Sequence, residues 1–298
     1  MSADPGALPN STPASATGAV AKFLRMVKFE HTIFALPFAL AAAAIAARGH
    51  GLSVARVAGI VIAMAGARTA AMGFNRIVDR HIDAKNPRTA GRELPTGAIS
   101  LGAAWAMTIA ASLVFLAAAA ALGWLCLALA PIALAILLGY SLTKRFTALC
   151  HLFLGLAIAG GPAGAWIAVR GDFGWTPGLL MLAVACWIAG FDILYALADR
   201  DFDRAAGLHS IPARLGVTGS LVVSALLHAV TIAALLAIAA TAHMGIPYLA
   251  GVAVVTALLV YEHAIVRPSD LSRLDMAFFN LNGYVSVAFF VATLIDVL

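Results

Sequence analysis

Long apolar runs alternate with short polar segments along most of the chain. A helix needs about 20 apolar residues to cross the roughly 30 Å hydrocarbon core of a bilayer. Runs that fit such helices fall near residues 32–47, 57–77, 103–122, 125–142, 149–169, 177–198, 219–242, 246–266 and 276–297. The stretch from 101 to 142 is too long for one crossing, and we divide it at Gly123-Trp124. The pattern therefore predicts an all-α, polytopic membrane protein with nine transmembrane helices in a bundle.

The first residues differ from this pattern. Residues 1–20 are rich in Pro, Ser, Ala and Gly, and we expect them to form a disordered tail. Lys22, Arg25 and Lys28 then precede the first apolar run, which resembles the start of a signal peptide. The many later spans favour a first transmembrane helix instead. We therefore expect one transmembrane domain over residues 21–298.

Composition supports a membrane location. Of the 298 residues, 62% are hydrophobic and 11% are charged, whereas soluble domains carry about 25% charged residues. The three cysteines lie in apolar stretches without metal-ligand spacing, so we expect buried thiols. This composition excludes an ordinary soluble globular domain.

The basic residues alternate between the two sides of the predicted bundle. With the N-terminus in the cytoplasm, most of the 19 Lys and Arg residues fall in cytoplasmic segments. This agrees with the positive-inside rule, and one missed helix would destroy the agreement. The net charge of +5 then reflects topology and gives no reason to expect nucleic acid binding. We expect a multi-pass protein of the cell (inner or plasma) membrane.

Polar residues recur with helical spacing where the second predicted helix ends. In the segment GFNRIVDRHID, Asn75, Asp79 and Asp83 are four residues apart and share one face of a helix. Arg68 lies seven residues earlier, on the same face and deeper in the membrane.

A second polar stripe ends the sixth predicted helix. In GFDILYALADRDFD, the residues Asp192, Tyr195, Asp199 and Asp203 also share one helical face. Asp192 lies about two turns inside an apolar span, where an ionisable residue is costly and usually functional. The two stripes are four helices apart, so an alternating bundle places both at the cytoplasmic side. Solvation of acids at helix ends is the alternative, but it does not explain this paired arrangement.

Carboxylates at such density suit Mg²⁺, which takes carboxylate, water and phosphate oxygens. Basic residues follow the stripes, and Arg and Lys are the usual donors to phosphate. The candidates for a diphosphate are Lys144, Arg145, Arg88 and Arg92. For any one of these residues taken alone, positive-inside topology is the better explanation. As a set facing a carboxylate site, some of them are expected to contact phosphate.

Two further groups lie near the C-terminal end. Glu262 and His263 end the eighth predicted helix, and we expect them to lie at the membrane interface. Asn280 and Asn282 in the ninth are expected to form interhelical hydrogen bonds.

The two stripes resemble the paired motifs NxxxDxxxD and DxxYxxxDxxxD of the UbiA superfamily of intramembrane prenyltransferases. NRIVDRHID and DILYALADRDFD match at every motif position, and NPRTAGRELPTG and YSLTKRF are also similar to family segments. The resemblance runs from about Phe23 to the C-terminus. KFEHTIFALPFAL, GLHSIPARLG and FFNLNGYVS most resemble the 4-hydroxybenzoate polyprenyltransferase branch.

The resemblance implies an enzyme whose helices surround a central cavity open to the lipid. It implies transfer of a polyprenyl group from polyprenyl diphosphate to an aromatic acid, most simply 4-hydroxybenzoate, in quinone biosynthesis. The implied metal ligands for two Mg²⁺ ions are Asn75, Asp79, Asp83, Asp192, Asp199 and Asp203. The five aspartates and Tyr195 would form the catalytic set, and the lipid bilayer would receive the prenyl tail.

Several alternatives remain open at this point. Tyr195 could orient a carboxylate, stabilise a cation through its ring or simply pack. Arg68 could bind the acceptor's carboxylate or pair with a motif aspartate. A dihydroxynaphthoate, as in menaquinone biosynthesis, is an alternative acceptor. A cation-coupled transporter also places acids in a bundle, but its path would need ionisable groups in the outer half of the membrane, where these helices are nearly all apolar.

Overall fold

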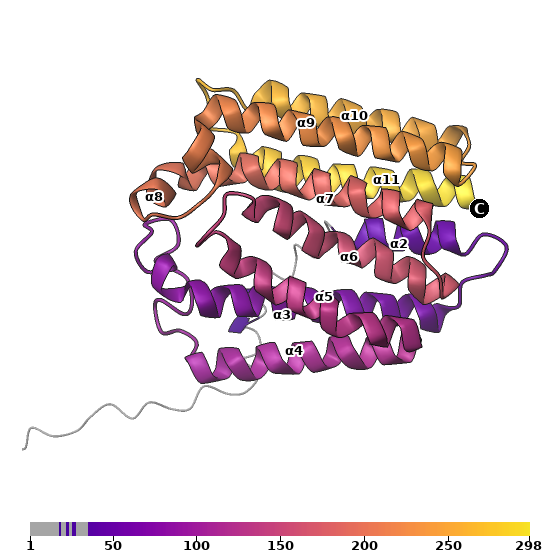
Figure 1. Ribbon diagram of the computed structural model, residues 1–298, viewed down its shortest axis with the longest axis horizontal. Coiled ribbons are helices and arrows are strands. Elements are labelled where there is room, and N and C mark those ends of the chain that lie inside the picture. Colours follow the sequence, from indigo (N-terminus) through magenta and orange to yellow (C-terminus); the bar gives the residue numbers. More distant parts are fainter. Residues whose placement is uncertain (1–17, 19–21, 24–25, 28–34) are drawn as a thin grey trace, which may run out of the picture.

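Apolar helices lie side by side along one direction and form the body of the molecule (Figure 1). The computed structural model describes residues 18, 22–23, 26–27 and 35–298. Its elements are α2 (Leu36–Ala46), α3 (Val54–Asp83), α4 (Leu101–Leu122), α5 (Trp124–Thr143), α6 (Cys150–Arg170), α7 (Trp175–Tyr195), η2 (Ala196–Asp199), α8 (Arg200–Ala205), α9 (Ile211–Thr241), α10 (Ile246–Ile265), η3 (Met276–Leu281) and α11 (Asn282–Val297). No β-strand occurs in this described part.

Eight stretches of helix in the described residues are long and apolar enough to cross a membrane. They correspond to eight of the nine predicted spans. The first predicted span, 32–47, lies partly outside the described residues, and its described part is the 11-residue helix α2. The predicted tail at residues 1–20 also lies outside them, apart from residue 18. The all-α polytopic fold is confirmed.

Local sequence signals determine where the helices begin. The side chains of Ser53, Ser100 and Ser210 accept hydrogen bonds from backbone N–H groups in the first turns of α3, α4 and α9. Proline opens α2, α9 and α10, where its missing N–H costs nothing. Gly123 has φ 144°, a conformation that only glycine adopts easily. It separates α4 from α5, as the sequence predicts.

Two helices depart from regular α geometry near the predicted site. Helix α7 ends at Tyr195 and continues as a 3₁₀ turn before the short helix α8. The prediction that Asp192, Asp199 and Asp203 share one continuous α-helical face is therefore wrong beyond Tyr195, because a 3₁₀ turn has three residues per turn instead of 3.6. The C-terminal span begins with the π-helical turn η3.

Successive long helices run in opposite directions (Figure 1). Helix α8, which follows α7, lies at the left of the view and the C-terminus lies at the right. The C-terminal ends of α3 and α7 lie at the same end of the bundle. The alternation inferred from the sequence thus brings both polar stripes to one end, which we call the motif end.

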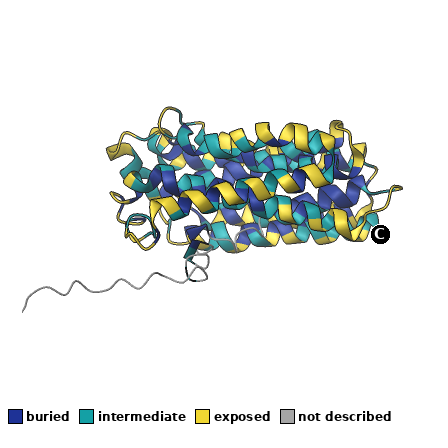
Figure 2. Ribbon diagram, turned by 90° about the horizontal axis from the view of Figure 1, so that it is seen from below, coloured by how far each residue is buried: buried dark blue, intermediate teal, exposed yellow. Residues whose placement is uncertain are grey.

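Small residues allow the helices to approach closely in the core. Six of the eleven residues of α2 are alanine, and a Cβ built on Gly155 of α6 would lie 2.2 Å from the carbonyl oxygen of Ala185 in α7. Such small residues are typical of helix contacts in membranes. Buried positions face the interior of the bundle, whereas exposed ones cover its outer faces along its full length (Figure 2). Many exposed residues are large and apolar, among them Ile109, Leu113 and Leu226.

An ion pair closes the end opposite the motif end. Nη2 of Arg48, just after α2, lies 2.8 Å from Oδ2 of Asp296 near the end of α11. Asp296 also accepts hydrogen bonds from the backbone N–H groups of Gly245 (2.9 Å) and Tyr248 (3.3 Å) at the start of α10. Arg48 donates to the carbonyl oxygen of Ala242, directly after α9. Four helices are therefore joined through one carboxylate and one guanidinium.

We expect Asp296→Ala to lower the thermal unfolding temperature in detergent. The side chain of Asp296 is 2% exposed, and its loss leaves the helix-start N–H groups of Gly245 and Tyr248 and a partly buried cation without their acceptor, at a cost of about 1–3 kcal/mol. Asp172→Ala is the matched control, since the Asp172 side chain is 55% exposed and lies 3.6 Å from its arginine partner. Equal unfolding temperatures for the two variants would contradict the stabilising role of this ion pair.

Candidate active site

The first motif lies in the last turns of α3, where its central carboxylate is surrounded by donors. Asp79 is 2% exposed. Its Oδ2 lies 2.8 Å from Nζ of Lys144 and accepts a hydrogen bond from Nδ2 of Asn75 at 3.1 Å. Its Oδ1 lies 3.2 Å from Nη2 of Arg145. Lys144 and Arg145 belong to the short connection between α5 and α6, so this connection lies against the motif.

The last carboxylate of this motif is bound by the segment that follows it. Oδ1 of Asp83 lies 2.7 Å from Nη1 of Arg92, and the hydroxyl of Thr89 donates to the carbonyl oxygen of Asp83 at 3.0 Å. Asp83 is 5% exposed. The connection between α3 and α4 thus folds back over the end of α3.

The same connection reaches the second motif. Arg88 forms a two-pronged ion pair with Asp199, in which its Nε lies 2.8 Å from Oδ1, and Nδ2 of Asn86 donates to the same carboxylate at 2.9 Å. Nη1 of Arg88 also donates to the hydroxyl of Tyr195 at 3.1 Å. Burial alone would lower the pKa of Arg88, but the hydrogen bonds and charge of Asp199 raise it above its ordinary value. Arg88 therefore stays charged and ties the connection that follows the first motif to the second motif.

Asp203, the last motif carboxylate, lies near the connection from α8 to α9. The N–H of Leu208 donates to the carbonyl oxygen of Asp203 at 2.8 Å, and the N–H of His209 donates to that of Lys144 at 2.7 Å. Because Lys144 pairs with Asp79, these bonds join the second motif to the first from another direction. The structure brings together Asn75, Asp79, Asp83, Tyr195, Asp199, Asp203, Lys144, Arg145, Arg88 and Arg92.

Asp192 has a partner that sequence reasoning missed. Nδ1 of His151, in the first turn of α6, lies 2.7 Å from Oδ2 of Asp192. Nε2 of His151 accepts the N–H of Ile211, the first residue of α9, at 3.4 Å. Because Nε2 is an acceptor, the ring carries its hydrogen on Nδ1 and donates it to Asp192. A single histidine at the start of an apolar run gives no signal of this contact in the sequence.

Arg68 lies in α3, half-buried and two turns before Asn75. At 1.5 Å per residue, it is about 10 Å along the helix axis from the first motif residue, toward the middle of the bundle. This is the depth expected from the sequence. Its proposed contact with an acceptor stays a prediction.

The carboxylates do not form a dedicated metal cage. Within the described residues, no three His, Cys, Asp or Glu side chains gather so as to hold a metal ion by themselves. Mg²⁺ is usually bound by one or two carboxylates together with waters and substrate phosphates. The donor set, with buried carboxylates on two helix ends and cations beside them, therefore fits Mg²⁺ held jointly with a phosphate ligand.

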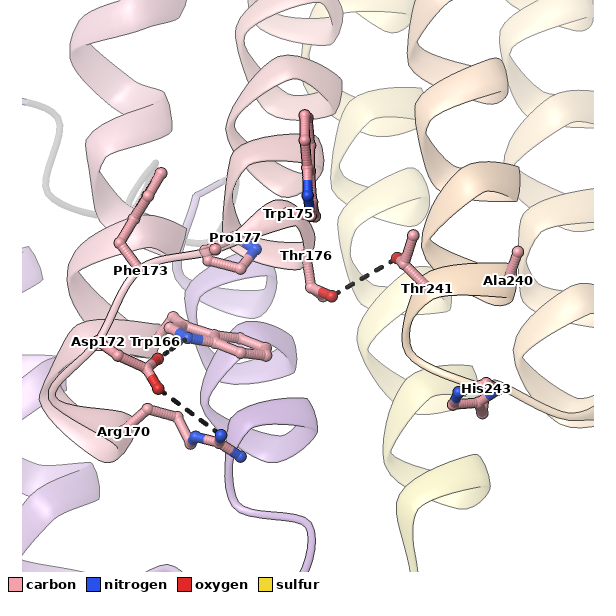
Figure 3. A pocket seen from close by; sticks show the side chains of 11 residues that line it. Trp166, Arg170, Asp172, Phe173, Trp175, Thr176, Pro177, Ala240, Thr241 and His243 are labelled. Atoms are coloured by element: carbon pink, nitrogen blue, oxygen red, sulfur yellow. Dashed lines mark hydrogen bonds and ion pairs between the residues drawn. The ribbon is translucent and has the colours of Figure 1, made fainter.

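A pocket of about 430 Å³ lies at the opposite end of the bundle, near the start of α7 (Figure 3). Its charged residues bind one another. Asp172 lies 3.6 Å from Arg170 and accepts a hydrogen bond from Trp166 at 3.1 Å. Phe173 and Trp175 are exposed beside them, as aromatic residues at a membrane interface usually are. This pocket is far from both motifs and lacks their carboxylates.

The fold and the site together define an intramembrane helical bundle with two aspartate-rich helix ends at one side. The family model described as the UbiA prenyltransferase family matches residues 35–284. The chain belongs to this family. It is an enzyme of the aromatic prenyltransferase type, and the transporter alternative is set aside.

Curated relatives agree with this assignment. The chain is 33% identical over 233 residues to a 4-hydroxybenzoate octaprenyltransferase from Xanthomonas euvesicatoria pv. vesicatoria, covering 77% of this chain and 76% of that one. It is 32% identical over 227 residues to a protein of the same name from Pseudoalteromonas translucida, covering 76% and 77%.

Solved structures share the fold. A UbiA homologue from Aeropyrum pernix K1, in its apo form, superposes with a TM-score of 0.83 at 37% identity and covers 91% of this chain and 99% of its own. A UbiA homologue from Archaeoglobus fulgidus bound to GPP and Mg²⁺ superposes with a TM-score of 0.65 at 21% identity, covering 92% and 99%. At that identity the second likeness shows the fold alone.

We expect His151→Leu to lower the thermal unfolding temperature, because it removes the donor to Asp192 inside the bundle and the acceptor for the N–H of Ile211. The loss should be about 1–2 kcal/mol. His151→Asn is the matched variant, because its side-chain amide can still donate near the position of Nδ1 and should recover part of the loss. If both variants unfold at the wild-type temperature, the pair does not stabilise the fold.

Proposed function

We propose that the protein transfers a polyprenyl group from polyprenyl diphosphate to 4-hydroxybenzoate in a Mg²⁺-dependent reaction. The observation that carries this proposal is the meeting of two aspartate-rich helix ends with four basic side chains at the motif end of an apolar bundle. Such a site can hold a highly charged diphosphate at the boundary of the membrane, while the apolar bundle accepts the tail. The names of the curated relatives support 4-hydroxybenzoate as the acceptor.

The proposed metal ligands are the six polar motif residues, Asn75, Asp79, Asp83, Asp192, Asp199 and Asp203. When bound, Mg²⁺ neutralises the diphosphate and makes it a better leaving group. Lys144, Arg145, Arg88 and Arg92 already lie within ion-pair distance of motif carboxylates. A diphosphate held between these carboxylates is therefore within reach of the same cations, which stabilise the charge that develops on it.

The remaining steps concern the two substrates. The allylic C–O bond breaks, pyrophosphate leaves with the bonding electrons, and a new C–C bond forms at the ring carbon ortho to the phenol. The ring then loses the proton from that carbon. A cationic ring loses a proton readily, so we assign no histidine as a base. Apolar helices around the reacting carbon exclude water, which would otherwise convert the allylic cation to an alcohol.

Arg68 is our candidate for the acceptor's carboxylate. It lies on the same helix as the first motif, about 10 Å deeper along the axis, and half-buried. A bidentate guanidinium–carboxylate contact there would turn the phenol toward the diphosphate. A dihydroxynaphthoate also carries a phenol and a carboxylate, and it is the second candidate acceptor.

We propose that the motif end faces the cytoplasm of the cell membrane. The basic residues of the site, which fall in the segments predicted to lie inside, support this orientation. Labelling of single cysteines in the connections between helices would test it.

We expect Asp79→Ala to lower Mg²⁺-dependent transfer by more than about 100-fold, since it removes a buried candidate ligand and leaves Lys144 and Arg145 without their partner. Pyrophosphate release from polyprenyl diphosphate in membranes, with and without 4-hydroxybenzoate, measures the effect. The matched control is Asp201→Ala, because Asp201 lies at the same end, is 79% exposed and pairs only with neighbouring Arg200 among the contacts of the described residues. Retained activity in Asp79→Ala would refute the assignment of the active site. A wild-type enzyme that prefers a dihydroxynaphthoate to 4-hydroxybenzoate would refute the proposed acceptor.

We expect Arg68→Ala to raise the KM for the aromatic acceptor by about 10- to 100-fold, the cost of one charged hydrogen bond. The KM for polyprenyl diphosphate should stay within about twofold, because the diphosphate is bound at the other end of the stripe. Arg68→Lys keeps the charge but loses the bidentate geometry. Its KM for the aromatic acceptor should therefore lie between the values of the wild type and of Arg68→Ala. An unchanged acceptor KM would show that Arg68 does not bind this substrate.

A further inference from the structure

The C-terminal span places an aromatic cluster against the second motif. The rings of Tyr195 and Phe278 are stacked, with centroids 4.0 Å apart and an interplanar angle of 24°. Phe279 meets the edge of Tyr195 at 6.0 Å, and Phe191 meets Phe278 at 5.3 Å. Tyr195, Phe278 and Phe279 are only partly buried. The motif tyrosine is thus covered on one face by Phe278.

A π-helical turn is the reason that Phe278 reaches this position. Met276–Leu281 forms the turn η3 before regular helix resumes at Asn282. A π turn contains one residue more than an α turn, and it often occurs at functional sites. It changes the direction of the side chains on it relative to those of α11, and it disturbs the backbone hydrogen bonds of the helix.

Asn282 stabilises this turn from within the bundle. It is 0% exposed, and its Nδ2 donates to the carbonyl oxygens of Ala277 (3.0 Å) and Phe278 (3.3 Å). The same amide donates to Oε1 of Glu262 in α10 at 3.2 Å, and its oxygen accepts the indole N–H of Trp187 in α7 at 2.8 Å. Four contacts on one amide set its orientation and join the turn to both neighbouring helices.

The hydroxyl end of Tyr195 meets the charged site. Its hydroxyl accepts a hydrogen bond from Arg88, whose guanidinium carbon also lies 5.3 Å from the ring centroid. Arg88 pairs with Asp199, a motif carboxylate four residues away. Tyr195 is therefore held at its hydroxyl by the diphosphate end of the site and at its ring by Phe278.

We propose that Phe278 and Asn282 are positioning residues for Tyr195, which forms the aromatic wall beside the carbon that becomes cationic. This inference rests on the proposed prenyl transfer. Asn282 holds the π turn, the turn presents Phe278, and Phe278 holds the Tyr195 ring against the site. An aromatic face attracts a cation, and a stacked wall also keeps water away from it.

The test is a double-mutant cycle on the full-length protein in membranes, with polyprenyl diphosphate, Mg²⁺ and 4-hydroxybenzoate. The variants are Phe278→Leu, Tyr195→Leu and the combination of both. Three quantities are measured for each: kcat, the KM for both substrates, and the ratio of prenyl alcohol to prenylated acceptor. Phe290→Leu is the matched control, since Phe290 lies three turns further along α11 and packs on the hydrophobic core.

We expect Phe278→Leu to lower kcat by about 3- to 10-fold, the value of one aromatic pair, with both KM values little changed. The share of prenyl alcohol should rise, because a loosened wall admits water. Phe278→Trp keeps an aromatic ring and should recover most of the loss. The double variant should be no worse than Tyr195→Leu alone, since Phe278 acts through Tyr195.

Asn282→Leu should raise the alcohol share in the same way. It also strips Trp187 and Glu262 of a partner and can destabilise the fold, so the cycle at Phe278 and Tyr195 decides the matter. Independent, additive losses, or an alcohol share in Phe278→Leu equal to that of Phe290→Leu, would overturn the inference. A wild-type protein that makes no prenylated acceptor would instead overturn the proposed function.

Discussion

Charged groups cannot be left unpaired at the ends of apolar helices, and this constraint organises the whole motif end. Asp79 and Asp83 are nearly fully buried, where an isolated carboxylate would be very unstable. Each is therefore met by a cation from a different connection: Asp79 by Lys144 and Arg145, Asp83 by Arg92. The connections between helices are consequently not free loops. Their course is determined by the carboxylates that they neutralise.

The same pairing explains how residues more than 100 positions apart form one site. Arg88 follows the first motif in sequence but binds Asp199 and Tyr195 of the second. Lys144 binds Asp79 through its ammonium group, while its carbonyl oxygen accepts the N–H of His209 after α8. Side chains that are expected to contact a diphosphate thus also hold the two helix ends together. Removing any of them affects the geometry of the site as well as its charge.

Most of the architecture could be predicted because its signals are local. Apolar run length predicted eight of the spans, and Gly123 marked the one division that length alone could not resolve. Contacts between distant segments could not be predicted in this way. The pairing of His151 with Asp192 depends on how α6 packs on α7, and Glu262, expected at the interface, is 1% exposed because Asn282 binds it inside the bundle. The expected interhelical bonding of Asn282 is confirmed.

The motif faces show the limit of periodic reasoning. Asn75, Asp79 and Asp83 lie on a continuous α-helix, so their spacing of four places them as expected. In the second motif a 3₁₀ turn starts at Ala196, and no residue in ALAD signals it. Asp199 ends this turn and Asp203 lies in the short helix α8 that follows it, so neither stands on the regular α-helix that carries Asp192. The motif is recognisable in sequence, but its geometry depends on a local distortion.

The π turn of the last span depends on the number of residues in that segment of the protein. A π turn is equivalent to one residue inserted into an α-helix. Deletion of a single residue between Met276 and Leu281 would let the helix become regular, with α11 still packed in its present register. Because the wide turn absorbs the extra residue, the segments on both sides would keep their positions, and only the residues within the turn would shift. This shift would turn the side chain of Phe278 away from Tyr195. A protein of this fold whose sequence is one residue shorter at this point would thus lack this packing of a phenylalanine against the motif tyrosine, even where both aspartate motifs are intact.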